Sequence, residues 1–555
     1  DLDTKETTYD QLQGSATNNV LTVNGGTFGG NVAAARASIA NNNTLNLLGG
    51  TFAKHVYAVN ASTEAKNNKV NIGAEGKAPT DLNLSSTTIA AYDKSSSQDL
   101  NHESNSLNVY TKDLVANNVE AFDEYNFYLP VGIANGDKIL TLTDENRTDV
   151  SNSTIGVTLQ NGATLNQEDK ISLITNANGL NAKGIKGGLD ATTEDGSITK
   201  KFTLSTDDNT IFATYGGKTE VNGFVDGDAT SSSKPEGDLT AEDITVNAGS
   251  KITGNVIAAN TDKGNVSDAT VSITNSTVEK DVIAGQAGVG TVANSKVEIG
   301  GDDTVISGTV SAGKVDNGTV IEAKVTLNGG TVKEIIGGIA KTGEAVKNVV
   351  DLVKGTVKEK LFGGKVEDNG IARNNTVNLK GGIVDSVFGG KVDNGGQSKE
   401  NIVNLLGATV TKIFGGSCDT AKGNVTNLID GTVTDAVYAG YGDVENIDNV
   451  INIGSETQSD LSKLDLTAAK LHGGKEGTDN KGNTLNVYGK TKAKGVVDFD
   501  NYNFYNVKVN EQDAHLALTD NVDLTDSKIS VELAKGTNLT VGDTVNLIST
   551  QGTLT

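Results

Sequence analysis

Few side chains in this sequence have the types and the spacing that catalysis or metal binding requires. The four histidines, His55, His102, His472 and His515, do not have the spacing of metal ligands. His55 and His472 each precede a glycine corner, so we expect packed or solvated corner positions for them. No G-x-S-x-G nucleophile motif occurs. The prediction is a protein that is not an enzyme, with no cofactor and with no catalytic, cofactor-binding or metal-binding residues.

Paired carboxylates are the strongest alternative source of chemistry, because two of them suffice to cleave a glycosidic bond. Adjacent acidic residues occur at Asp207-Asp208, Asp302-Asp303 and Glu367-Asp368. Solvated acidic loops have the same composition, and the calcium-loop pattern D-x-[DN]-x-[DN]-G is absent. We therefore expect loops at these positions, and a β-helical polysaccharide-degrading enzyme remains the alternative.

The overall composition limits the class of partner. The net charge of −24 and the presence of only three arginines argue against binding to nucleic acid. No apolar run approaches the roughly 20 residues of a membrane-spanning helix, so no transmembrane segment is predicted. The single cysteine, Cys418, follows a glycine corner, and we expect it in a solvent-facing loop. Because the chain opens at Asp1 without a signal peptide, we expect a piece of a larger protein.

One phrase, N-x-V-N-L-x-G-G-T-V followed by an aromatic residue and Gly-Gly, recurs along the chain. Clear copies occupy residues 375–390, 401–416 and 424–440. The residue after the second Asn recurs at intervals of 25, 27, 26, 23 and 25, at Leu327, Leu352, Leu379, Leu405, Leu428 and Ile453. A period of this length predicts a solenoid.

Alternation within the phrase predicts strands. Val377 and Leu379 share one face, while Thr376 and Asn378 share the other. Glycine at the corners permits a sharp turn. The fold prediction is therefore all-β, a right-handed parallel β-helix, with Phe362, Phe388, Phe414 and Tyr438 stacked one per coil. The pairs expected in the inward column include Leu45/Leu47, Val70/Ile72, Leu82/Leu84, Leu107/Val109, Val325/Leu327, Val350/Leu352, Val403/Leu405, Ile451/Ile453 and Leu485/Val487.

Asparagines recur in the outward column of these strands. They are Asn46, Asn71, Asn83, Asn108, Asn378, Asn404, Asn427, Asn452 and Asn486. Stacked amides form hydrogen bonds along such a column, so we expect a structural ladder. A polar face that binds a ligand is the alternative interpretation.

A larger unit occurs twice. The sequence Y-N-F-Y at residues 125–128 returns at residues 502–505, and I-S-L-I at 171–174 returns as V-N-L-I at 545–548. Two tandem β-helix modules are expected, each ending in an aromatic-bearing β module whose rings close the core or, alternatively, bind sugars. The predicted boundaries are 1–110 for the end of the first array, 111–220 for its capping module, 221–242 for an acidic, serine-rich linker or loop, 243–490 for the second array, and 491–555 for a second, truncated capping module.

The order of these motifs resembles the passenger regions of bacterial autotransporters, the adhesins of type V secretion. Glycine-cornered coils, then Y-N-F-Y-L-P, L-T-L-T-D and G-D-x-V-x-L-I strands carry the resemblance over residues 18–174 and 243–548. It implies an extracellular passenger at the bacterial outer-membrane surface, carried there by a C-terminal β-barrel. The sequence contains no such barrel segment, and the Y-N-F-Y module occurs twice where the family is expected to have one.

The functional prediction is a non-enzymatic, cell-surface or secreted adhesin that attaches to host or neighbouring cells. Its partner is expected to be a protein or glycan receptor, with a self-associating biofilm or fibre protein as a further alternative. The binding residues are not identified by the sequence. Loops of variable length are expected to make the contacts, at residues 61–68, 94–104, 261–268, 338–347 and 364–374.

Overall fold

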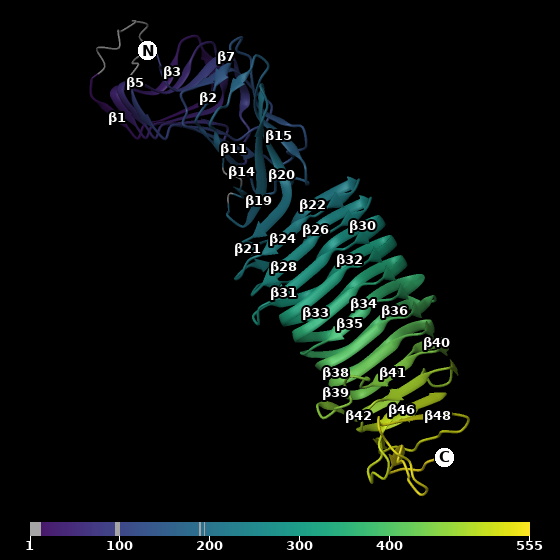
Figure 1. Ribbon diagram of the computed structural model, residues 1–555. Coiled ribbons are helices and arrows are strands. Elements are labelled where there is room, and N and C mark those ends of the chain that lie inside the picture. Colours follow the sequence, from purple (N-terminus) through teal and green to yellow (C-terminus); the bar gives the residue numbers. More distant parts are fainter. Residues whose placement is uncertain (1–12, 95–99, 188–189, 194) are drawn as a thin grey trace. The chain divides into compact units, whose positions relative to one another are not determined.

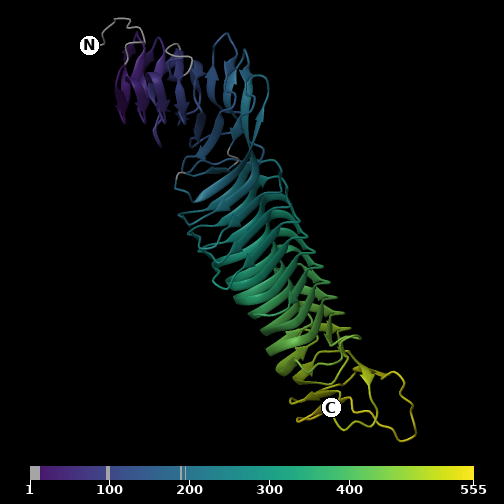
Figure 2. The same cartoon turned by 60° about the vertical axis from the view of Figure 1, so that its left-hand side comes forward.

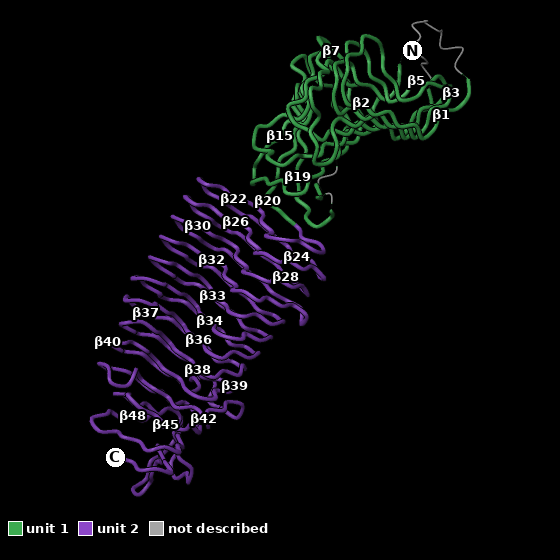
Figure 3. The backbone as a smooth tube through the Cα atoms, turned by 180° about the vertical axis from the view of Figure 1, so that it is seen from behind, with its two compact units in different colours: residues 1–219 green, residues 220–555 purple. Residues whose placement is uncertain are grey.

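The computed structural model describes residues 13–94, 100–187, 190–193 and 195–555. All regular elements within these ranges are β-strands. The chain divides into two compact units, residues 1–219 and 220–555 (Figure 3). Within each unit, strands of successive coils pair in parallel and lie side by side (Figure 1, Figure 2). The predicted all-β fold, a parallel β-helix, is confirmed.

In unit 1, strands of successive coils pair to form two sheets, which we call the first and the second face. The first face contains, in stacking order, β2 (Val20–Phe28), β4 (Thr44–Phe52), β6 (Lys69–Ile72), β9 (Ser106–Val109), β11 (Glu124–Leu129) and β14 (Thr154–Leu159). The second contains β3 (Val32–Asn41), β5 (Val56–Lys66), β7 (Thr80–Tyr92), β10 (Leu114–Glu120), β12 (Lys138–Leu142) and β15 (Lys170–Asn176). Parallel stacking of the second face ends at β15, because β20 (Thr210–Val221) pairs with it in the antiparallel sense.

Unit 2 repeats the same plan with more coils. Its first face runs through β24 (Asp243–Val246), β28 (Thr270–Thr274), β31 (Lys296–Gly300), β33 (Lys324–Val346), β34 (Val349–Arg373), β35 (Thr376–Leu379), β38 (Ile402–Lys422), β39 (Val425–Tyr438), β41 (Val450–Ile453), β44 (Thr484–Val487) and β46 (Asn501–Val507). Its second face includes β26 (Val256–Lys263), β30 (Val282–Ala293), β32 (Val305–Ile321), β36 (Ile383–Asn394), β42 (Leu464–His472) and β45 (Thr491–Val497). The long strands β33, β34 and β38 contribute to both faces.

The inward column of unit 2 is confirmed as predicted. Val325, Val350, Val377 and Val403 are successive register partners, and all four are fully buried. Thr426 takes the next position and is buried as well, so one hydroxyl replaces one methyl in the column. The column then continues through Ile451 and Leu485 to Tyr502.

In unit 1 the inward orientation predicted for Leu82 and Leu84 is confirmed, but their assignment to the first-face column is wrong. Val70 pairs with Leu107, so β9 stacks directly on β6. Asn83 instead pairs with Thr51 near the end of β4, and its side chain accepts hydrogen bonds from Ser85 within the same strand. The alternating pattern alone does not distinguish a first-face strand from the next side of the coil.

The segment 221–242 is not a linker or a protruding loop. It forms β21 (Phe224–Val225), β22 (Ala229–Glu236) and β23 (Leu239–Thr240), which pair in parallel with the following coil. Ser231 and Ser232 are buried within β22. Pairing with the backbone of the next coil holds this polar segment in a strand, although its composition is typical of a loop.

The Y-N-F-Y segments continue the solenoid rather than forming separate modules, and each follows a shortened coil. Their strands β11 and β46 continue the first faces of the two units. The turn positions Asn105 and Asp123 are 18 residues apart, and Asn483 and Asp500 are 17 apart, whereas a full coil of the array takes about 25 residues. These coils therefore lack the third side.

Buried aromatic side chains lie where each shortened coil meets the next coil. Tyr125 and Tyr502 are each 1% exposed. Phe122 packs edge-on against Tyr125 with ring centroids 5.7 Å apart, and Phe499 packs against Tyr502 at 5.8 Å. The interpretation of these aromatic residues as part of the core is confirmed for the inward-facing rings, although further strands stack beyond them, so they do not cap the solenoid.

The third side of the full coils is a strand, so the loop conformation predicted there is wrong, while the contact role of these segments stays a prediction. Residues 338–346 lie in β33 and residues 364–373 in β34, and the two segments pair in register. Residues 61–66 belong to β5, and residues 261–263 and 266–267 lie in β26 and β27 (Val266–Ser267). The prediction for 94–104 falls partly on residues 95–99, which lie outside the described ranges; β8 (Asn101–Glu103) pairs with β5.

Candidate functional site

The four histidines contact four different partners. His55 is exposed and stacks on Tyr57 at 5.6 Å, and a ring nitrogen of His102 lies 3.2 Å from the Asp123 carboxylate. His515 is buried and packs edge-on against Phe504 at 6.0 Å. His472 is buried as the last ring of an aromatic stack, described below. The expected packed or solvated positions are confirmed for His55 and His472.

The adjacent carboxylates serve local structure. Oδ1 of Asp207 accepts hydrogen bonds from the backbone N–H groups of Asn209 and Thr210 in a turn. Asp302 forms an ion pair with Lys354 at 2.7 Å. Asp368 accepts a hydrogen bond of 2.8 Å from Asn394 of the next coil. The loop prediction fails for Glu367-Asp368, which lies inside β34.

A buried asparagine ladder runs along the turn before the first face. Asn375 donates from its backbone N–H and from Nδ2 to Oδ1 of Asn401, at 3.0 and 2.9 Å, and Asn401 repeats the pattern with Asn424. The unit 2 ladder comprises Asn348, Asn375, Asn401, Asn424, Asn449 and Asn483, and unit 1 has Asn43, Asn68 and Asn105, all fully buried. Asp500 and Asp123 terminate the two ladders as acceptors.

Sequence reasoning missed the role of this ladder. Its signal is an Asn at a constant phase, two residues before the inward Val, following a residue that can adopt positive φ. The residues before Asn43 and Asn375 have φ of 57° and 55°. Asparagine is also typical of exposed turns, so the single-coil pattern did not indicate burial.

The outward asparagines form the second ladder, as predicted. In unit 1, Nδ2 of Asn71 donates to Oδ1 of Asn46 at 2.8 Å, Asn108 donates to Asn71 at 2.7 Å, and Asn126 donates to Asn108 at 2.9 Å. In unit 2 the ladder runs through Asn378, Asn404, Asn427, Asn452, Asn486 and Asn503, with distances of 2.7 to 2.8 Å. Each amide is thereby held in one orientation on the surface of the first face.

A stacked tyrosine pair lies beside the last amides of each outward ladder. Tyr110 and Tyr128 have ring centroids 4.0 Å apart at an interplanar angle of 13°. Tyr488 and Tyr505 repeat the arrangement at 4.4 Å and 9°. All four rings are half-buried. Each ring stacks on its partner, so one face of each ring is covered.

In unit 1 the amides and tyrosines line a depression of about 570 Å³. We call this surface the amide–tyrosine face and define it by Asn46, Asn71, Asn108, Asn126, Tyr110 and Tyr128. Thr44, Lys69, Ser106 and Glu124 complete its polar surroundings, and all except Asn46 line the depression. Strands β4, β6, β9 and β11 supply these side chains, except that of Tyr110, which follows β9 directly, so a rigid stack of strands positions them.

The two units differ at the end of this face. In unit 2, Oγ of Ser530 donates to Oδ1 of Asn503 at 2.6 Å. In unit 1, the register partner of Asn126 is Gly156, which has no side chain to donate. A Cβ atom at Gly156 would lie 2.4 Å from Oδ1 of Asn126. The last amide oxygen therefore extends over bare backbone in unit 1, whereas a hydroxyl contacts its counterpart in unit 2.

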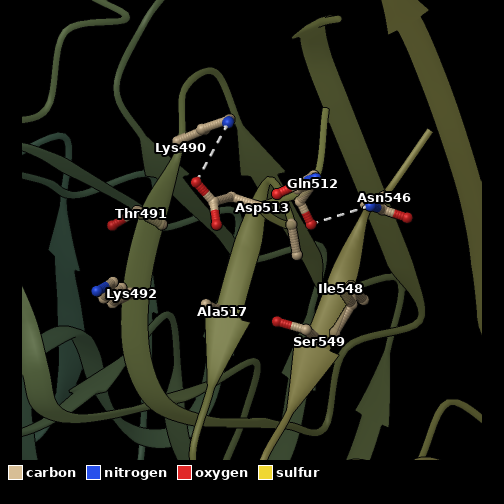
Figure 4. A pocket seen from close by; sticks show the side chains of 10 residues that line it. Lys490, Thr491, Lys492, Gln512, Asp513, Ala517, Asn546, Ile548 and Ser549 are labelled. Atoms are coloured by element: carbon tan, nitrogen blue, oxygen red, sulfur yellow. Dashed lines mark hydrogen bonds and ion pairs between the residues drawn. The ribbon is translucent and has the colours of Figure 1, made fainter. Parts of the chain in front are cut away.

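A second depression, of about 520 Å³, lies near the C-terminal coils of unit 2 and contains paired charges (Figure 4). Lys490 lies 4.0 Å from Asp513 and 3.1 Å from Glu511, and Asn546 donates to the carbonyl of Gln512. In unit 1, Lys112 follows its tyrosine at the same spacing and pairs with Asp137 at 2.7 Å. The recurrence of this ion pair indicates a structural role for Lys490, which joins consecutive coils.

The predicted stack of aromatic rings is confirmed in unit 2. Phe362, Phe388, Phe414 and Tyr438 stack with centroid distances of 4.9, 4.6 and 5.1 Å, and His472 follows Tyr438 at 4.3 Å. Phe362 and Phe388 form a small apolar cluster with Ile336, while Lys365 and Lys391 lie 5.7 and 5.4 Å from their ring centroids. The faces of the inner rings are occupied by neighbouring rings, which indicates a structural role.

His472 predicts a pH dependence of stability. Burial, and then the charge of Lys470, lower the pKa of His472 to about 4. The unfolded imidazole, with a pKa of 6.5, binds a proton first as the pH falls, so stability is lost between pH 6.5 and about 4. At pH 4.5 the loss is about 2–3 kcal/mol. Urea unfolding of the wild type and of His472→Phe at pH 7 and pH 4.5 measures it. Phenylalanine keeps the ring stack, so an unchanged pH dependence in this variant contradicts the assignment.

Cys418 is buried, and the prediction of a solvent-facing loop position is wrong. The residue lies within β38 and is 6% exposed, and its Sγ accepts a hydrogen bond of 3.1 Å from the N–H of Ser398. Burial raises the pKa of the Cys418 thiol to about 12. The third-side strand, which the sequence did not reveal, places this residue inside the coil.

The buried thiol is expected to react slowly. A pKa raised from 9.0 to about 12 lowers the thiolate fraction at pH 8 on the order of 10³-fold. We therefore expect an aromatic disulfide reagent to label the unfolded chain rapidly and the folded chain at least about 100-fold more slowly. Cys418→Ser provides the blank, and equal labelling rates in the two states would show that the thiol is accessible.

Comparison of the sequence with protein-family models finds no match, and neither does comparison with curated proteins or with solved structures. Among the described residues, none belongs to an apolar helix long enough to cross a membrane. Within the same residues, no group of three or more His, Cys, Asp or Glu side chains is arranged to hold a metal ion. The amide–tyrosine face is the candidate functional site that the geometry favours.

Proposed function

We propose that this chain is a non-enzymatic attachment protein of a bacterial cell surface, with the organisation of an autotransporter passenger, and that it binds host or neighbouring cells. The observation that carries the proposal is the duplicated outward ladder with its tyrosine pair. The arrangement recurs in both units with nearly identical hydrogen-bond lengths. A rigid polar surface on stacked strands suits attachment, because its side chains are held in place before a ligand binds.

The carboxylates support a binding role rather than a hydrolytic one. A glycoside hydrolase keeps one carboxylic acid protonated by raising its pKa. In this chain the pKa values of several carboxyl groups are lowered instead. Burial raises the pKa of Asp351 and of Asp393, but hydrogen bonds and lysine charges outweigh it and lower the pKa of both. Hydrogen bonds from Thr467 lower the pKa of Asp465. These groups therefore remain ionised as structural acceptors.

A polysaccharide-cleaving enzyme is the second candidate, and Asp498 is the residue that favours it. Burial, and then the charge of Glu476, raise the pKa of Asp498. Its Oδ2 atom is buried without a hydrogen-bond partner among the described residues. The equivalent position before Phe122 in unit 1 is Ala121, so this feature is not duplicated.

Two measurements distinguish the attachment protein from the polysaccharide-cleaving enzyme. Fluorescently labelled chain is incubated with epithelial cells and with bacterial cells, and saturable binding that unlabelled chain displaces is the expected result. The same preparation is incubated with neutral and acidic polysaccharides, and we expect no new reducing ends. Turnover that Asp498→Asn abolishes would replace the attachment proposal with the enzyme, and absence of saturable binding to any cell would overturn the proposal.

A further inference from the structure

We propose that the amide–tyrosine face of unit 1 binds an extended, uncharged glycan chain that lies along the outward ladder. The inference rests on the proposed function, because it names the ligand through which attachment occurs and the surface that recognises it. It is carried by three features of the face: the hydrogen-bonding capacity left on its amides, the open end at Gly156, and its balance of charge.

Each ladder amide keeps half of its hydrogen-bonding capacity. A primary amide has two N–H donors and two acceptor lone pairs. Within the ladder, Asn71 and Asn108 each spend one N–H on the preceding oxygen and one lone pair on the following amide. One donor and one acceptor per coil therefore remain for a ligand. Because the ladder fixes their orientation, the ligand does not have to pay for ordering them.

The spacing of these groups favours a polymer. Adjacent strands of a sheet lie roughly 4.8 Å apart, so the face presents a donor and an acceptor at that interval along its length. A hydroxyl is both a donor and an acceptor, and a glycan carries hydroxyls at regular intervals. An extended glycan can thus contact several coils at once. The hydroxyls and ring edges of Tyr110 and Tyr128 border the depression next to the last two amides.

The open end distinguishes unit 1 from unit 2. Oδ1 of Asn126 lies over Gly156, whereas Ser530 donates to the equivalent oxygen of Asn503. A ligand hydroxyl can donate a hydrogen bond to Oδ1 of Asn126, as Ser530 does to Oδ1 of Asn503 in unit 2. The chain therefore contains its own matched comparison, with an open face in unit 1 and a closed one in unit 2.

The charges favour an uncharged ligand. One cation, Lys69, and one anion, Glu124, lie among the lining residues, so the face has no local excess of either sign. The net charge of the whole chain is −24, which repels polyanions such as sulfated glycans. A neutral glycan is not repelled by the net charge, and it does not require a local excess of charge on the face.

The test uses the full chain and calorimetric titration. The probes are soluble oligosaccharides of glucose, mannose and N-acetylglucosamine, with a heparin fragment as the anionic probe. We expect at least one neutral oligosaccharide to bind, and Lys69→Trp, which places a large ring in the depression at an exposed position, to weaken that binding at least roughly tenfold. Lys54→Trp, at an exposed corner of the same unit, serves as the matched control and should bind as the wild type does.

A second variant tests the open end. Gly156→Ser brings a Cβ atom within 2.4 Å of Oδ1 of Asn126, so it must displace this amide and should weaken binding. The converse change, Ser530→Gly, should not weaken it. Thermal unfolding checks that each variant remains folded. Binding of the heparin fragment alone, or equal effects of Lys69→Trp and Lys54→Trp, would overturn the inference. If cells bind the chain but no neutral glycan does, the inference is overturned and the proposed function stands. If a glycan binds but no cell does, the proposed function is overturned and the inference stands.

Discussion

Replacing Asn401 with leucine is expected to lower the free energy of unfolding of unit 2 by about 3–5 kcal/mol, because several buried polar groups lose their partners together. Oδ1 of Asn401 accepts two hydrogen bonds from Asn375, and its Nδ2 donates to the carbonyl of Ala372. Leucine satisfies none of these groups, and water cannot reach them in a position that is fully buried.

The matched control for this prediction is Asn404→Leu. Asn404 lies three residues after Asn401, within β38 and in the outward ladder, and is only half-buried. Its loss should cost about 1 kcal/mol, because solvent can replace the ladder bonds. Hydrogen exchange of the coils on either side of residue 401 provides the measurement, since solenoid coils can open locally without global unfolding. Equal effects of the two substitutions would show that burial of the first ladder contributes little.

Replacing Tyr125 with alanine is expected to destabilise unit 1 by about 3–5 kcal/mol, the usual cost of removing a large buried aromatic side chain. Tyr125 is 1% exposed, and its ring contacts Phe122. Tyr125 lies within the core of unit 1, between its register partners Leu107 and Ile155, so its removal leaves a cavity. The resulting cavity should also increase proteolysis of the coils next to β11.

The duplicated sequence provides the control for this second prediction. Tyr502→Ala removes the equivalent ring, which is also 1% exposed, and should destabilise unit 2 while leaving unit 1 unchanged. Limited proteolysis with identification of the cleavage sites assigns each effect to a unit. Cleavage in unit 2 of the Tyr125→Ala variant would contradict the view that each aromatic ring stabilises only the unit that contains it.

Much of the fold could be predicted because its determinants are local and repeat in phase. Alternation in N-x-V-N-L placed Val377 and Leu379 inward and Asn378 outward, and repetition of the phrase brought equivalent residues into register. The outward amide ladder and the stack from Phe362 to Tyr438 follow from that register alone. In a parallel stack, residues at the same phase become neighbours, so the period itself predicts the contacts.

The third side and the shortened coils could not be predicted in the same way. Residues 338–346 and 364–373 have irregular polar composition, and backbone pairing between neighbouring coils keeps them extended. That pairing depends on the position of the adjacent coil, which no local pattern reports. The same dependence explains why residues 221–242 form strands and why Cys418 is buried.

The candidate site was predicted only in its components. The sequence identified an outward column of asparagines and two clusters of aromatic residues, with ligand binding as an alternative for each. It did not indicate that Tyr110 stacks on Tyr128 beside the last amides, or that Gly156 lies under Asn126. These relations join different coils, and they depend on a coil length that drops from about 25 residues to 18 just before the Y-N-F-Y segment.

By itself, the sequence determined the solenoid, its inward columns and its outward ladder, because a strand period of two and a coil period near 25 leave few other ways to bury the apolar residues. Only the tertiary structure decided which asparagines are buried, where the third side ends, and which surface stays open. Burial and closure depend on what the neighbouring coil places opposite each residue. The sequence pattern within a single coil does not contain that information.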